Sequence, residues 1–254
     1  MILALDLDDT LLRTDKSISS RSIDALQRWF EAGHEVIVAT GRPPRQVDAV
    51  IPDLLRTAPR IVYNGAQLID SGAVLYRNEI STADVRDVIA WTQRCRPDWV
   101  VGLEINDQLY VNKPTNKPGQ WVVEDLQSIC DQPAAKVLFL FAEKRHDFSP
   151  LLDALPPTTR VLISPKFAMV QLCGHTTDKV DALQYLLQTR GLTLGDVAAI
   201  GDDVNDIEMV RMAGVGVAMG NAVDEVKAVA NWIAPTNDDD GVAVAIDWLL
   251  QRIA

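Results

Sequence analysis

Three carboxylates stand at the end of an apolar run near the start of the chain. The run ILALDL (residues 2 to 7) is typical of a buried strand, and Asp6, Asp8 and Asp9 lie at its carboxyl end. Carboxylates this close in a poorly solvated place raise one another's pKa unless they share a proton or a cation. A hard cation suits oxygen ligands, and Mg²⁺ fits best. The residues therefore predict a metal-assisted site at the end of this strand.

The spacing of Asp6 and Asp8 indicates a working pair. Alternation along an extended strand sends both side chains to the same side and Leu7 to the other. One carboxylate can attack an electrophile, while the second gives a proton to the leaving group and later takes one from water. A phosphoryl group is the expected electrophile, because its transfer is catalysed mostly by positioning and charge neutralisation. We therefore expect an aspartyl-phosphate intermediate.

Further polar residues follow two other apolar runs, EVIVAT (35 to 40) and VAAIG (197 to 201). Because ligands of parallel α/β sheets bind outside the carboxyl ends of the strands, these residues should converge on one crevice. Lys179 stands at the start of a predicted helix and supplies a positive charge. The residues at the carboxyl ends of the two runs are Thr40, Gly41, Arg42, Asp202, Asp203, Asn205 and Asp206.

The elements that must position these residues alternate between strands and amphipathic helices at both ends of the chain, as in a parallel sheet covered by helices. Between them, short alternating runs and two helical stretches, one capped at Ser81 and one near 118 to 130, indicate an α+β insert. The predicted fold class is α/β, a Rossmann-like parallel sheet core with an inserted α+β domain. The expected boundaries are 1 to 81 and 176 to 254 for the core, and 82 to 175 for the insert.

Composition excludes several classes of protein. The 254 residues are 48% hydrophobic and 23% charged, as in ordinary globular domains. The net charge of −11 argues against a nucleic-acid partner, which would require clustered Lys and Arg. Apolar runs are too short to cross a bilayer, and no secretory leader precedes Asp6, so we expect no membrane partner and a cytoplasmic location. The three cysteines lack the spacing of a zinc site.

Four motifs in this order, DLDDT, ATGR, the lone Lys179 and GDDVND, resemble those of the haloacid dehalogenase superfamily of phosphatases. The insert's place, with YNGA (63 to 66), GVAMGNA (216 to 222) and DDDGVAVAI (238 to 246), is similar to the Cof-type (class IIB) branch, whose members carry an α/β cap there. The resemblance covers nearly the whole core, and the cap matches in its position and in its pattern of short strands and helices. It implies the fold of that superfamily, Mg²⁺ as cofactor and phosphoric monoester hydrolysis.

Residue by residue, the resemblance implies that Asp6 is the nucleophile and Asp8 the general acid and base. The Mg²⁺ ligands would be Asp6, the backbone carbonyl of Asp8 and the side chain of Asp202. Asp206 would orient Lys179 or a metal-bound water, and Arg42 would support the site. The transferring phosphoryl group would be bound by Leu7, Thr40, Gly41, Lys179 and Asn205. Asp9 departs from the pattern, because many relatives have glycine there.

Each of these residues also has a plain structural interpretation. Asp202 and Asp206 could cap the following helix, Thr40 could merely end a β-branched strand, and Lys179 could be a solvated helix residue. Arg42 either faces solvent or reaches the substrate.

Three functions are compatible with the motifs. The first is a Mg²⁺-dependent phosphatase of small phosphorylated metabolites such as sugar phosphates, with the cap closing over the substrate. The second is a phosphotransferase or phosphomutase, in which the same intermediate passes to a sugar hydroxyl. The third is a phospho-accepting signalling module, which the length and the insert disfavour. Specificity should reside in the cap, where the loop 112 to 119 offers Lys113 and Lys117. The oligomeric state is left open.

Overall fold

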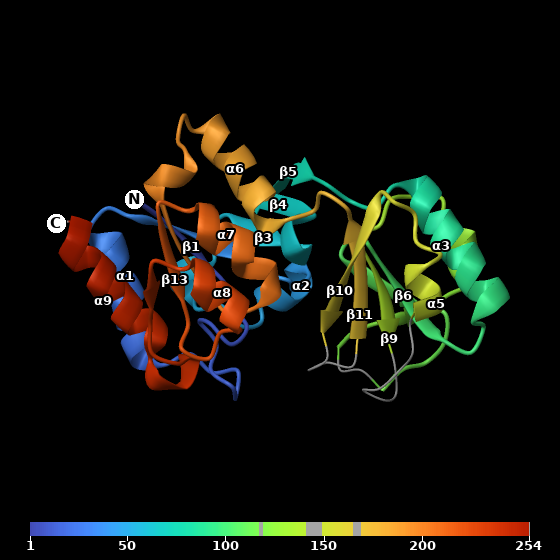
Figure 1. The fold of residues 1–254 in the computed structure, drawn as a ribbon, viewed down its shortest axis with the longest axis horizontal. Coiled ribbons are helices and arrows are strands. Elements are labelled where there is room, and N and C mark those ends of the chain that lie inside the picture. Colours follow the sequence, from blue (N-terminus) through green and yellow to red (C-terminus); the bar gives the residue numbers. More distant parts are fainter. Residues whose placement is uncertain (117–118, 141–148, 165–168, 254) are drawn as a thin grey trace. The chain divides into compact units, whose positions relative to one another are not determined.

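The computed structural model describes residues 1–116, 119–140, 149–164 and 169–253, and the chain forms two compact units (Figure 1). Unit 1 comprises Met1–Arg77 and Asp178–Ala254, and unit 2 comprises Asn78–Thr177. The division falls four residues before and two residues after the boundaries expected from the sequence. Contacts of the crossing segments explain the difference: the Thr177 hydroxyl donates to the Asn78 carbonyl (2.7 Å), and Ile80 pairs with Ala134.

An eight-stranded sheet forms the centre of unit 1. Its first six strands in spatial order are parallel, and the last two are antiparallel to their neighbours. This confirms the predicted α/β core with a parallel sheet. In spatial order the strands are β14 (Trp232–Ile233), β13 (Val215–Ala218), β12 (Val197–Gly201), β1 (Ile2–Leu5), β2 (Glu35–Ala39), β3 (Arg60–Val62), β4 (Gln67–Asp70) and β5 (Ala73–Arg77).

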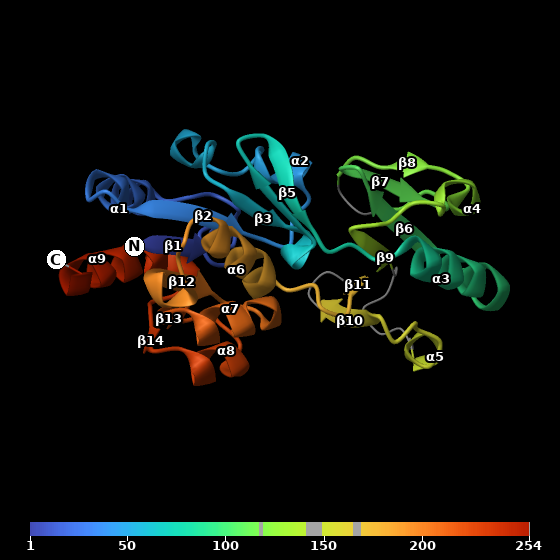
Figure 2. The same cartoon turned by 90° about the horizontal axis from the view of Figure 1, so that it is seen from above.

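Helices cover both faces of this sheet. Ile2 and Ala4 of β1 pack against α6 and α7 on one face, whereas α1 and α9 lie side by side on the other (Figures 1 and 2). The α-helices of unit 1 are α1 (Ser20–Glu31), α2 (Pro44–Val47), α6 (Lys179–Thr189), α7 (Ile207–Met212), α8 (Asp224–Val229) and α9 (Gly241–Ile253). Its 3₁₀ turns are η1 (Asp53–Leu55), η2 (Tyr63–Gly65), η4 (Leu194–Asp196), η5 (Val204–Asp206) and η6 (Asn237–Asp239).

Unit 2 is a six-stranded sheet with helices packed against its core. Its strands in spatial order are β10 (Thr159–Ser164), β11 (Met169–Gly174), β9 (Lys136–Leu140), β6 (Val100–Ile105), β7 (Gln108–Val111) and β8 (Val122–Val123). Its helices are α3 (Thr82–Cys95), α4 (Leu126–Ile129) and α5 (Ser149–Leu152). The helix expected near 118 to 130 is wrong in extent: residues 122 and 123 pair with β7 instead, and the Asp125 side chain starts a single helical turn.

Side-chain caps define where the longer helices begin. The hydroxyl of Ser19 accepts from the Ser22 N–H at the start of α1, and that of Ser81 accepts from the Asp84 N–H at the start of α3. The Asp178 carboxylate accepts from the Val180 N–H and so begins α6 at Lys179. Among the described residues, no helix is both long and apolar enough to cross a bilayer.

Candidate active site

The adjacent strands β1 and β12 bring Asp6 and Asp202 together. Leu5 lies beside Ile200 in the parallel register, and the Asp6 N–H continues the ladder by donating to the Ile200 carbonyl at 3.1 Å. From this point the chain runs from β1 to β2 on one side and from β12 to β13 on the other. The two acids therefore lie at the topological switch point, where α/β sheets bind ligands.

A buried lysine joins two of the acids. Lys179 Nζ donates to Asp6 Oδ1 at 2.7 Å and to Asp206 Oδ1 at 2.6 Å, and the lysine side chain is fully buried. Burial alone would lower the pKa of the Lys179 ammonium, but the charges of Asp206 and Asp6 outweigh it and raise that pKa. Lys179 is therefore a fixed positive charge inside the site and not a solvated helix residue.

Asp206 organises the turn that carries Asp202. Its second oxygen, Oδ2, accepts from the N–H groups of Asp202 (3.0 Å) and Asp203 (3.1 Å), while Oδ1 accepts from Lys179. Asp203 in turn caps η5, as a helix-start interpretation predicts. Because both oxygens of Asp206 already accept hydrogen bonds, this residue fits a role in orienting Lys179 better than a role as a metal ligand.

The acidic cluster has the chemistry of a cation site. Asp6, Asp202 and Asp206 each offer an oxygen within 4.8 Å of the others. Burial, the largest cause, raises the pKa of Asp6 to about 7 despite the lysine, and burial with the charges of Asp6 and Asp206 raises the pKa of Asp202 to about 8. Thr10 holds one oxygen of Asp202, with Oγ1 to Oδ1 at 2.9 Å. Buried carboxylates with raised pKa values need a nearby positive charge to stay ionised. A hard divalent cation with oxygen ligands would supply it.

Asp8 takes a different partner from Asp6. The strand β1 ends at Leu5, so the two acids lie in the turn beyond it and not on an extended strand, as the alternation argument assumed. Arg42 grips Asp8 with two hydrogen bonds, Nε to Oδ2 at 2.6 Å and Nη2 to Oδ1 at 2.7 Å, and Lys16 Nζ lies 3.0 Å from Oδ1. The Arg42 side chain therefore pairs with Asp8 and does not simply face solvent.

This pairing sets the charge of Asp8. Burial would raise the pKa of its carboxyl, but hydrogen bonds and charge from Arg42, aided by Lys16, lower it below its ordinary value. Asp8 is therefore ionised in this arrangement, which is the form of a general base. A general acid would require the protonated form instead.

The other predicted residues lie in the segments that follow β1, β2 and β12. Thr40 is fully buried, and its Oγ1 accepts from the Arg42 N–H at 3.2 Å. Asn205 Nδ2 donates to Asn64 Oδ1 at 3.0 Å. The apolar side chain of Leu7 is buried, so Leu7 can contribute only its backbone. Gly41 lies against Asn64, because a Cβ at position 41 would come 2.6 Å from Asn64 Oδ1.

Three residues of this region were missed by motif reasoning. Thr10 lies within DLDDT and Asn64 within YNGA, so a signal for both was present without a role. Lys16 had no signal, because its contact with Asp8 depends on how the loop after β1 folds back. That loop is anchored to the chain's other end by Arg13 to Asp240 (2.6 Å).

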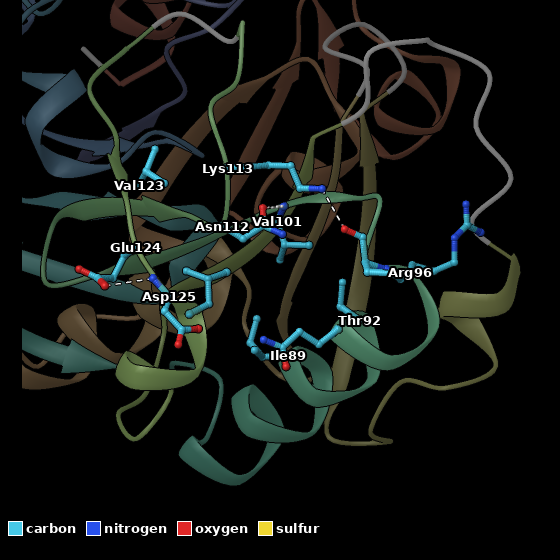
Figure 3. Close-up of a pocket in the computed structure, with 12 residues that line it drawn as sticks. Ile89, Thr92, Arg96, Val101, Asn112, Lys113, Val123, Glu124 and Asp125 are labelled. Carbon is cyan, nitrogen blue, oxygen red and sulfur yellow. Dashed lines mark hydrogen bonds between the residues drawn. The ribbon is translucent and has the colours of Figure 1, made fainter.

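A separate pocket of about 520 Å³ lies within unit 2, between the end of α3 and the segments around β7, β8 and α4 (Figure 3). Two of its polar side chains bind nearby backbone carbonyls: Asn112 Nδ2 donates to the Trp99 carbonyl at 3.0 Å, and Lys113 Nζ donates to the Pro97 carbonyl at 2.8 Å. The Lys113 ammonium therefore holds its own loop in place. Lys117, the other lysine suggested for substrate contact, lies outside the described residues.

Comparison with known proteins agrees with this geometry. Residues 3–246 match a family model described as haloacid dehalogenase-like hydrolase. The chain is 31% identical over 98% of its length to the 5-amino-6-(5-phospho-D-ribitylamino)uracil phosphatase YcsE of Bacillus subtilis, covering 96% of that protein. It is 30% identical over 95% of its length to the pyridoxal phosphate phosphatase YbhA of Escherichia coli, again covering 96%.

A solved structure shares the architecture. The crystal structure of a haloacid dehalogenase-like hydrolase from Bacteroides thetaiotaomicron superposes with a TM-score of 0.81 at 28% identity, covering 98% of each chain. The matching family model spans both segments of unit 1 and the unit inserted between them. The chain therefore belongs to the haloacid dehalogenase-like hydrolase family and is a phosphatase of its Cof-type branch.

Proposed function

We propose that the protein is a Mg²⁺-dependent phosphatase of small phosphorylated metabolites that works through an aspartyl-phosphate on Asp6. The observation that carries the proposal is the setting of Asp6: it is buried, bound by Lys179 at 2.7 Å, and within 4.8 Å of an Asp202 oxygen. A carboxylate held beside a buried ammonium, with a second acid close enough to share a cation, is well placed to act as a nucleophile. Asp6, Asp202 and the Asp8 carbonyl would hold Mg²⁺, which would neutralise charge on the phosphoryl group and lower the barrier to attack.

In the first step an Asp6 oxygen attacks phosphorus, and the bond from phosphorus to the leaving oxygen breaks. Lys179, the Thr40 hydroxyl and the Asn205 amide would bind the oxygens of the transferring group. Asp8 must enter this step protonated and released from Arg42, and it gives its proton to the leaving oxygen. It regains that proton from water in the second step, which resets it for the next turnover. An incoming phosphate ester carries the negative charge that would compete for the Arg42 guanidinium.

In the second step water releases phosphate from Asp6. Asp8, now ionised, takes a proton from the water as the water oxygen attacks phosphorus, and the bond between phosphorus and Asp6 breaks. The pair with Arg42 keeps Asp8 ionised, which is the form that can accept a proton. The Asp6 carboxylate then returns to Lys179.

The substrate class rests on the relatives. Two of them are named as phosphatases of a ribityl-linked uracil phosphate and of pyridoxal phosphate, both small phosphorylated molecules. We propose the same broad class here, sugar phosphates included, and a cytoplasmic location. A screen of phosphorylated metabolites with Mg²⁺, scored by released phosphate, tests it. Transfer to added sugars in place of phosphate release would instead identify a phosphotransferase.

Metal binding should stabilise the protein more as the pH rises. Asp6 and Asp202 hold protons more tightly when folded, with pKa values of about 7 and about 8, than in the unfolded chain, where Asp titrates near 3.8. The metal-free protein therefore loses stability between about pH 4 and about pH 8, and Mg²⁺ must displace those protons to bind. We expect saturating Mg²⁺ to raise the Tm by about 3 to 8 °C at about pH 8, and by clearly less at about pH 6.

Thermal unfolding with and without Mg²⁺ at the two pH values checks this. Asp202→Asn removes a proposed ligand and should abolish most of the increase in Tm. An equal increase at both pH values, or one that persists in Asp202→Asn, would count against the assigned metal site.

A further inference from the structure

The turn η2, which follows β3, holds three successive residues in left-handed conformations. The φ angles of Tyr63, Asn64 and Gly65 are +54°, +60° and +101°. Asparagine tolerates this region and glycine prefers it, but a bulky tyrosine there is an outlier. Strain of this kind persists only where surrounding contacts over-determine the backbone. The contacts of η2 identify what it supports.

One set of contacts reaches the loop after β2. The Asn64 N–H donates to the Thr40 carbonyl at 3.1 Å, and the Tyr63 N–H donates to the Arg42 carbonyl at 3.0 Å. Gly41 lies between these two bonds, directly against the Asn64 side-chain oxygen. The backbone of η2 thus fixes the loop that carries Thr40, Gly41 and Arg42.

Another set reaches the start of α6. A Cβ at Gly65 would overlap the Asp178 backbone and lie 2.8 Å from the Lys179 nitrogen. Glycine at this position allows the turn to sit against the residue that begins the helix and against Lys179. The backbone of η2 therefore also contacts the segment that places the buried lysine.

The side chain of Asn64 has a contact of its own. Its Oδ1 accepts from Asn205 Nδ2 at 3.0 Å, and Asn64 is only 3% exposed. Rotation of the Asn205 amide by a half turn would place its oxygen against the Asn64 oxygen, which is repulsive. The amide nitrogen of Asn205 is thereby kept pointing toward Asn64, and no water can substitute easily for the buried acceptor.

We propose that Asn64 is a positioning residue, which acts on catalysis by fixing the orientation of the Asn205 side-chain amide. The proposal rests on the role given above to Asn205 at the transferring phosphoryl group. Asn64 itself need not touch the substrate. Its effect should therefore depend on Asn205 being present, whereas a purely structural role for Asn64 would not.

The test is a double-mutant cycle between Asn64→Gly and Asn205→Ala. Glycine keeps the left-handed backbone and both η2 backbone bonds while it removes the side-chain acceptor. We expect Asn64→Gly to lower kcat/KM about 10- to 100-fold, mainly through kcat. In the Asn205→Ala background the same change should cost less than about threefold. Asn106→Gly is the matched control, because Asn106 is exposed and also has a positive φ of 49°, and it should leave activity unchanged.

A second variant and a second readout distinguish the positioning role from a general loss of structure. Asn64→Asp keeps the backbone and an acceptor oxygen, so it should recover at least about tenfold in kcat over Asn64→Gly. In nitrogen–proton NMR spectra, the Asn205 side-chain amide signal, assigned by its loss in Asn205→Ala, should shift in Asn64→Gly and stay in place in Asn106→Gly. This readout needs no turnover.

The outcomes separate the two proposals. Equal losses from Asn64→Gly with and without Asn205, or an Asn205 amide signal that does not respond to Asn64→Gly, would overturn the positioning role even in an active enzyme. If the wild-type protein releases no phosphate, but the Asn205 amide signal still shifts in Asn64→Gly, the proposed function is overturned. The contact between Asn64 and Asn205 is then still supported.

Discussion

Asp6→Asn should abolish turnover while leaving the fold intact. The amide is nearly isosteric, and its oxygen can still accept from Lys179, but it cannot form an acyl phosphate and binds a divalent cation more weakly than a carboxylate. Because the chemistry then lacks its nucleophile, we expect kcat to fall by at least about 10⁴-fold. Phosphate release from the best substrate of the metabolite screen, measured with saturating Mg²⁺, provides the number.

Asp24→Asn is the matched control, since Asp24 is an exposed residue of α1. It should be fully active. The Asp6→Asn variant should unfold at a temperature no lower than the metal-free wild type, because it removes one of three crowded buried carboxylates. Retention of activity in a folded Asp6→Asn protein would remove Asp6 from the mechanism.

Lys179→Met should give the largest loss of stability. The fully buried ammonium lies between Asp6 and Asp206, at 2.7 Å and 2.6 Å. Its removal leaves two buried carboxylates facing each other without a cation, and breaking a buried ion pair from one side costs about 3 to 5 kcal/mol in the free energy of unfolding. Methionine preserves much of the apolar volume, so the loss reports charge more than packing.

Urea unfolding without divalent cations measures this effect. Without the lysine, the folded-state pKa of Asp6 rises further, so the variant should lose most stability at about pH 8 and recover part of it at about pH 5, where Asp6 takes up a proton. Lys179→Met with Asp206→Asn should also recover part. Lys227→Met on α8 is the control for loss of a less buried lysine and should change stability by under about 1 kcal/mol. A Lys179→Met protein as stable as wild type would contradict the buried ion-pair network.

Local pattern was sufficient to place the acids of the sheet. Asp6 and Asp202 each follow a short apolar run, and parallel strands deliver such residues to one edge, so their proximity follows from chain order and sheet geometry. The start of α6 at Lys179 follows from the capping residue before it. Burial of the Lys179 ammonium does not follow from local sequence, because it depends on Asp206 and Asp6, which lie 27 and 173 residues away.

The sequence did not predict which basic residue each acid would pair with. Nothing in DLDDT indicates that Asp8 would pair with Arg42, 34 residues later, while Asp6 pairs with Lys179. The motif YNGA did not reveal the left-handed turn at Asn64, because the role of that turn depends on tertiary contacts with Thr40 and Asn205. The helix predicted near 118 to 130 was wrong in extent because Val122 and Val123 are β-branched residues that favour a strand, and they pair with β7.

Trapping the phosphorylated carboxylate tests the central claim most directly. Asp8→Asn lacks the base for the second step, so its acyl phosphate should accumulate after mixing with Mg²⁺ and an aryl phosphate, whose leaving group needs no proton from Asp8. Acid quenching followed by borohydride reduction converts an aspartyl phosphate to homoserine, which peptide mass spectrometry locates. The account predicts homoserine at position 6 and at no other aspartate. Phosphate release with position 6 unmodified, or phosphate recovered on a different side chain, would contradict it.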